Sequence, residues 1–96
     1  MPKGYFISAH RSTADPEKRA AYLKLAGPAL EKYNGKVLAS TNKIKVFEDG
    51  KVEQTVLVGF ESFEKAAEFI DSKEYQDALL ALDGGANRDC RVFEGL

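Results

Sequence analysis

The chain is poor in the residues that build metal sites and disulfides. It holds one cysteine, Cys90, one histidine, His10, and no tryptophan among 96 residues. A single cysteine cannot form an internal disulfide, which favours a reducing compartment, so we expect a cytoplasmic protein. One histidine and one cysteine, with no CxxC or HxxxH spacing, cannot complete a tetrahedral zinc site. We therefore expect no metal.

Excess charge of one sign and long apolar runs are also absent. The 14 Lys and Arg residues against 15 Asp and Glu give a formal net charge of -1. Nucleic-acid-binding domains usually gather Lys and Arg into a basic face, so we expect no nucleic-acid partner. No stretch approaches the roughly 20 apolar residues of a membrane span, and the apolar run near the N-terminus is too short for a signal peptide. The phosphate-binding loops GxGxxG and GxxxxGKS are missing, and we expect no cofactor.

What the chain does contain is the patterning of one small α+β domain over residues 1–96. Its composition, 44% hydrophobic and 30% charged, is ordinary for a soluble protein. Apolar alternation and turn residues predict strands at 4–10, at 36–40 continued by 44–48, at 54–60 and at 88–93, with helices at 16–33, 63–70 and 73–82. The order β-α-β-β-α-β, with the second helical segment broken at Asp71–Ser72, predicts a ferredoxin-like fold with a four-stranded antiparallel sheet.

Capping residues set the predicted helix boundaries. Asp15 can cap the first helix, Ser62 the second, and Asp71 or Ser72 the third. Gly35 is expected to end the first helix with a positive φ. From their spacing, the expected buried faces are Ala20, Leu23, Gly27, Leu30 and Tyr33 in the first helix, Phe63, Ala66, Ala67 and Ile70 in the second, and Tyr75, Ala78, Leu79 and Leu82 in the third.

Both faces of the predicted sheet carry large apolar side chains. Phe6 points to one face with Ser8 and His10, whereas Tyr5 and Ile7 point to the other. Because both helices cover one face in this fold, the second face would be an exposed apolar patch of the kind that marks an interface. We expect a homodimer whose sheets pack face to face. The alternative is a monomer with a few exposed aromatic residues.

Two residues stand out as candidates for chemistry. His10 can titrate near neutral pH, and it could serve as a general base or a ligand hydrogen-bond donor if its face, shared with Ser8, lines a cleft. The alternative is a solvated histidine at the end of a strand. Tyr75 could wall a pocket, or it could be a core residue behind a capped helix break. Cys90 is expected to be a core residue of the last strand.

Stretches along nearly the whole chain resemble the domain-of-unknown-function family thirteen-thirty, of the dimeric α+β-barrel superfamily. The matching stretches are GYFISAH, DPE, GPALEKYNGKVLAS, EDG, VLVGFESFEKAAEF and DSKEYQ. The resemblance implies a barrel-like dimer with a cleft between sheet and helices. Some positions depart from the family: Ser40 begins a stretch where Arg-Gly-Gly is common, Phe69 replaces a Trp, and Asp83 replaces an Arg. An anion site made by those arginines in relatives would be absent here.

Taken together, these patterns predict a small homodimer that binds or transforms a small, partly apolar metabolite in a sheet/helix cleft. His10 is the candidate catalytic residue, and the candidate ligand-binding residues are Ser8, Ser40, Phe69 and Tyr75. One alternative is an enzyme resembling cofactor-independent monooxygenases or isomerases, which rests on fold analogy. The other is a non-catalytic structural or regulatory module.

Overall fold

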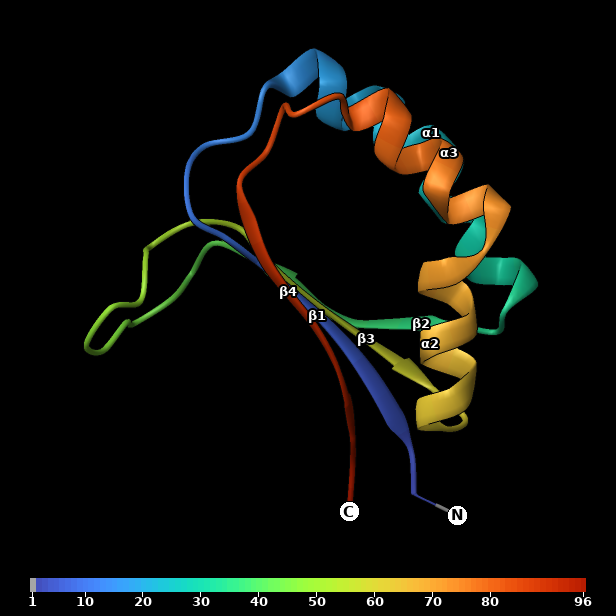
Figure 1. Cartoon of the computed structure of the whole chain (residues 1–96). Helices are drawn as coiled ribbons and strands as arrows, with labels where there is room; N and C mark the ends of the chain where they lie inside the picture. The colour runs from blue at the N-terminus through green and yellow to red at the C-terminus, as the bar shows by residue number, and fades with distance from the viewer. Residues whose placement is uncertain (1) are drawn as a thin grey trace.

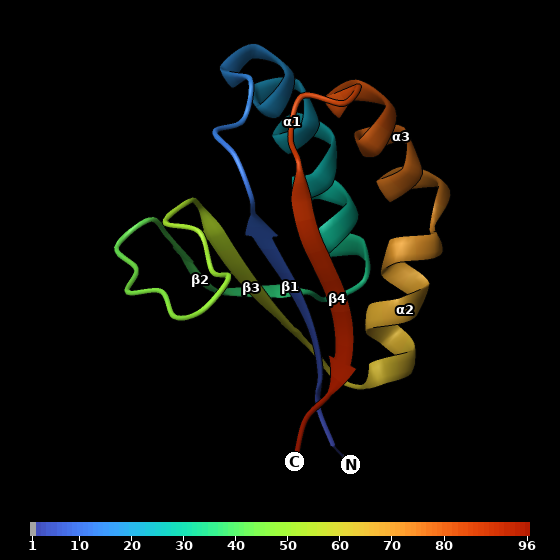
Figure 2. The ribbon, with the colours of Figure 1, turned by 60° about the vertical axis from the view of Figure 1, so that its left-hand side comes forward.

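The computed structural model of the protein describes residues 2–96 and has the predicted order of strands and helices. Its elements are β1 (Gly4–His10), α1 (Pro16–Lys32), β2 (Lys36–Thr41), β3 (Thr55–Phe60), α2 (Phe63–Asp71), α3 (Lys73–Leu82) and β4 (Arg88–Glu94). The strands form one antiparallel sheet in the order β2-β3-β1-β4. The helices cover one face of this sheet, with α1 and α3 side by side (Figures 1 and 2). This is the ferredoxin-like α+β fold, as predicted.

The core lies between the helices and the face of the sheet that carries Phe6, Val58 and Phe60. On β1 the predicted alternation is confirmed, because Phe6, Ser8 and His10 are all buried against the helices. Phe69 of α2 is completely buried, and its ring centroid lies 4.6 Å from that of Tyr75 and 5.4 Å from that of Phe60. This aromatic group joins α2 and α3 to the sheet.

The predicted buried faces are right for α3 and wrong for parts of α1 and α2. Helix α1 buries Tyr22, Ala26 and Ala29, whereas Leu23 of the predicted stripe is 47% exposed. The reason is that α1 packs mainly against α3, and the buried Ala26 and Ala29 are small enough to permit a close approach. In α2 the buried residues are Ala66 and Phe69, while Phe63, the first residue of the helix, is exposed.

The side chain of Ser72 shapes the break between α2 and α3. The Ser72 hydroxyl donates to the Phe69 carbonyl of α2 (2.7 Å) and accepts from the Tyr75 N–H of α3 (3.1 Å). One residue therefore ends one helix and caps the next. The predicted caps at Asp15 and Ser62 are also present, each accepting hydrogen bonds from the first turn of its helix.

Two predictions are wrong, one about the turn after α1 and one about a strand. Asn34, with φ of 58°, takes the left-handed conformation expected of Gly35. Gly35 is needed for space instead, since a Cβ there would collide with the Leu30 side chain and lie 2.9 Å from the Phe60 ring. The strand expected at 44–48 is absent: Thr41 pairs with Thr55, and beyond this pair the chain leaves the sheet as a loop (Figure 1).

Cys90 is the third correction. It is exposed rather than part of the core. The reason is that β4 is an edge strand of the sheet, so its side chains are covered less fully than those of β1. Within residues 2–96, none of the helices has the length and apolar character needed to cross a membrane.

Candidate functional site

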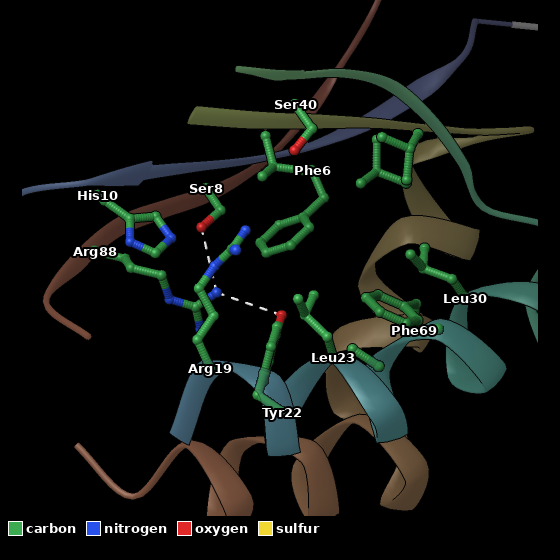
Figure 3. Close-up of a pocket in the computed structure, with 15 residues that line it drawn as sticks. Phe6, Ser8, His10, Arg19, Tyr22, Leu23, Leu30, Ser40, Phe69 and Arg88 are labelled. Atoms are coloured by element: carbon green, nitrogen blue, oxygen red, sulfur yellow. Dashed lines mark hydrogen bonds between the residues drawn. The ribbon is translucent and has the colours of Figure 1, made fainter. Parts of the chain in front are cut away.

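A cavity of about 210 Å³ lies between α1 and the helix-covered face of the sheet. Its floor consists of β-strand side chains, including Phe6, Val56 and Val58. Leu23 and Leu30 of α1 form the opposite wall (Figure 3). The predicted apolar stripe of α1 thus has a different role from the expected one: three of its members, Leu23, Gly27 and Leu30, border this cavity.

The structure brings together four of the five candidate residues. His10 and Ser8 line the cavity from β1, Ser40 from β2 and Phe69 from α2 (Figure 3). Ser40 is exposed and accepts a hydrogen bond from Gln54 Nε2 (2.9 Å). Tyr75 does not line the cavity. It is buried behind the cavity, where its ring packs against Phe69 and its hydroxyl lies 2.8 Å from that of Tyr22.

Two arginines complete the polar end of the cavity, and the sequence did not suggest them. Arg19 projects from α1 and Arg88 from the start of β4 (Figure 3). Arg88 is placed opposite His10 by the pairing of β1 with β4. The register of β1 with β4 was the missing signal for Arg88, because Arg88 lies far from His10 along the chain. Arg19 lies outside the apolar stripe that marked the inner side of α1.

Arg88 is held by hydrogen bonds from two elements. Its Nη1 donates to the Ser8 hydroxyl (3.2 Å) and to the Tyr22 hydroxyl (3.3 Å). The guanidinium carbon lies 5.1 Å from the centre of the Tyr22 ring, at the distance of a cation–π contact. The Tyr22 hydroxyl lies 2.8 Å from that of Tyr75. Burial, followed by the proximity of Tyr22, raises the pKa of Tyr75, so this phenol stays protonated.

His10 is buried beside these arginines. Burial lowers its pKa from 6.5, and the charges of Arg88 and Arg19 lower it further, while Glu53 acts in the opposite direction. The side-chain hydrogen bonds formed among residues 2–96 do not involve the His10 imidazole. A neutral imidazole has one nitrogen that accepts a proton or a hydrogen bond. The ring therefore has the protonation state and the free position that a general base or a ligand acceptor needs.

Among residues 2–96, His, Cys, Asp and Glu side chains do not gather in groups of three or more that could hold a metal ion.

A family model described as "Domain of unknown function (DUF1330)" matches residues 3–96. None of the curated proteins matches the chain. Among solved structures, a protein of unknown function from Rhodopseudomonas palustris is similar, with a TM-score of 0.77 and 18% identity over 99% of this chain and 83% of that one. SnoaB, a cofactor-independent oxygenase from Streptomyces nogalater, is similar with a TM-score of 0.60 and 10% identity over 97% and 92% of the two chains. At these identities the structures are evidence for the shared fold alone.

Proposed function

The chain belongs to the DUF1330 family, whose function is unknown, and we propose that it binds a small, partly apolar metabolite in the cavity between α1 and the sheet. The observation that carries this proposal is the cavity itself. Apolar side chains of the sheet and α1 surround a space of about 210 Å³, and His10, Ser8 and Arg88 gather at one end of it. A mostly apolar hollow with a few convergent polar groups is the usual form of a small-ligand site.

A substitution that places a larger side chain in the cavity tests this proposal. Apart from its own helix and its chain neighbours, a Cβ at Gly27 would have no neighbour within 4 Å, so the side chain of Gly27→Leu has open space to enter. We expect small apolar probes such as toluene to shift the methyl NMR signals of Val56 and Leu30 in the wild type, and not in Gly27→Leu. Ala20→Leu, which adds the same side chain at an exposed position of α1, is the matched control. Equal shifts in all proteins would overturn the proposal.

A second candidate function is an enzyme that begins with proton removal from an activated C–H bond, as in a cofactor-independent oxygenase or an isomerase. The specific observation in its favour is the His10 imidazole, which faces the cavity with its pKa lowered and takes no part in the side-chain hydrogen bonds within residues 2–96. We expect the protein to accelerate deuterium exchange at the central carbon of acetylacetone, and His10→Gln to abolish the acceleration. Thr41→Ala, an exposed residue of β2 outside the cavity, should retain it. A non-catalytic binding module would show no acceleration in any variant.

A homodimer through the uncovered sheet face is the third part of the proposal. Tyr5 and Phe93 stack on this face with ring centroids 5.6 Å apart, and Phe93 is 41% exposed. The helices lie on the opposite face only (Figure 2), so a second copy is the occupant that would shield this apolar side. We expect sedimentation at micromolar concentration to show a dimer, and Phe93→Glu to dissociate it. Leu80→Glu, at an exposed position of α3 on the helix side of the molecule, is the control. A 10.6 kDa particle would contradict the dimer.

A cytoplasmic location is also part of this proposal. The single cysteine, Cys90, is free and exposed. An exposed unpaired thiol is typical of proteins kept in a reducing compartment. Secretion of the full-length protein in its native host, detected by fractionation and immunoblotting, would contradict it.

A further inference from the structure

The charged side chains around the cavity are of one sign. Arg19 and Arg88 both reach its polar end, and the lining residues that the structure describes include no Asp or Glu (Figure 3). Glu53 borders a neighbouring hollow, where its carboxylate accepts from the Thr13 hydroxyl (3.1 Å). The ion pairs formed within residues 2–96 leave out both arginines. Partly buried like charges without a counter-ion destabilise a fold, and an anion bound between them would offset that cost.

Arg88 is prepared to receive such an anion. Its Nη1 is occupied by Ser8 and Tyr22, which fix the plane of the guanidinium. A guanidinium has five N–H groups, and those of Nε and Nη2 have no partner within the described chain. The planar fork of an arginine matches the two oxygens of a carboxylate. His10 adds a third polar group at the same end, and the close-up shows it beside Arg88 (Figure 3).

The other end of the cavity fits an apolar body. Phe69, Leu30 and Val58 line it, and Phe69 and Val58 are almost fully buried. The cavity has a volume of about 210 Å³. An apolar cavity of about 150 Å³ is already large enough to hold benzene. The space therefore suits one ring or a short branched chain.

We propose that the cavity binds a small organic carboxylate, with its oxygens between Arg19 and Arg88 and its apolar body against Phe69 and Leu30. This inference rests on the proposed binding function and adds the class of ligand. The anion site differs from the arginine positions that the family resemblance suggested, since it uses residues of α1 and β4.

Benzoate and its neutral analogue benzamide are the probes that test this assignment, with affinities measured by titration calorimetry and locations by NMR. We expect benzoate to bind at the cavity at least tenfold more tightly than benzamide. Arg88→Gln and Arg19→Gln should each weaken benzoate by about tenfold to a hundredfold, the size of a lost charge-assisted hydrogen bond, and leave benzamide unchanged. Arg91→Gln is the matched control, since Arg91 lies on the same strand, outside the cavity, and pairs with Asp89 (3.1 Å).

The possible outcomes separate the two proposals. Equal binding of benzoate and benzamide at the cavity would overturn the carboxylate assignment and leave the binding function standing. If toluene, benzoate and benzamide all fail to shift the cavity signals, both proposals are overturned. Competition by inorganic phosphate as strong as that of benzoate would overturn the requirement for an apolar body. Because Arg19 is half-exposed, Arg19→Gln gives a folded test protein even where Arg88→Gln impairs folding.

Discussion

The hydroxyl oxygens of Tyr22 and Tyr75 lie 2.8 Å apart, at a buried contact that joins α1 to α3. The first of these hydroxyls also accepts from Arg88, which in turn bonds Ser8. A line of hydrogen bonds thus runs from the helices to the sheet through the middle of the protein. The same groups that hold the helices also orient the cation at the polar end of the cavity.

The two tyrosines are expected to be coupled energetically. Tyr22→Phe removes a hydroxyl and leaves that of Tyr75 without its partner, so it should lower the free energy of unfolding by about 1–3 kcal/mol. Tyr75→Phe should cost a similar amount, and the double variant less than the sum of the two single changes. Urea unfolding of the four proteins measures this coupling. Strict additivity would show that the hydroxyl contact contributes nothing to stability.

Ser72 is expected to be the costliest capping serine to replace. Ser72→Ala removes the acceptor for the Tyr75 N–H and the donor to the Phe69 carbonyl, both of which are buried. We expect a loss of about 1–2 kcal/mol of unfolding free energy, measured by urea titration. Ser62→Ala is the comparison, because its single cap to Lys65 is exposed and should cost about half as much. Equal costs would count against the double role of Ser72.

Gly27→Ala is expected to stabilise the protein. Gly27 lies inside α1, and a Cβ there would meet no atom of another element within 4 Å. An alanine in a helix interior is more stable than a glycine by about 0.5–1 kcal/mol. Because Pro28 follows, its ring crowds the new Cβ and offsets part of this gain, so the melting temperature should rise by a smaller amount. Gly4→Ala is the opposite case, since its Cβ would collide with the main chain of Ser62, which cannot move aside as a side chain can. A destabilised Gly27→Ala would show that crowding by the Pro28 ring outweighs the gain in helix stability.

His10 is expected to make the protein less stable in mild acid. Its pKa is lowered from 6.5 in the folded state, so below neutral pH the unfolded chain binds more protons than the folded one. The stabilising contribution is complete above pH 6.5 and is lost as the pH falls from there towards the pKa of the folded state. His10→Gln should remove this part of the pH dependence of unfolding. An NMR titration of His10 with a midpoint above 6.5 would contradict the prediction.

The fold was predictable because its signals are local. Alternating apolar residues place Phe6, Ser8 and His10 on one face of β1, and capping residues set the starts of the helices at Asp15, Ser62 and Ser72. The loop after Thr41 was mistaken for a strand because its composition suits one. Only the register of β2 with β3 shows that no neighbouring strand is left for it.

Only part of the site was predictable, because only part of it depends on signals that are local in the sequence. Alternation along one strand is enough to place His10 and Ser8 together. Arg88 reaches them through pairing of β1 with β4, far apart in the sequence, and Arg19 through the rotation of α1 about its axis. Large apolar residues marked part of the cavity wall rather than the most buried residues of α1, because Ala26 and Ala29 carry little hydrophobic signal.

The single residue between α2 and α3 limits how this protein can change in length. Each residue added to a helix turns everything after it by about 100°, so one insertion beside Ser72 would rotate Tyr75 away from the Tyr22 hydroxyl, which also accepts from Arg88. Residues 42–54 form a loop outside the sheet, where gaining or losing residues disturbs no such alignment. Natural variation in chain length is therefore expected to gather in that loop and to spare the junction of the two helices.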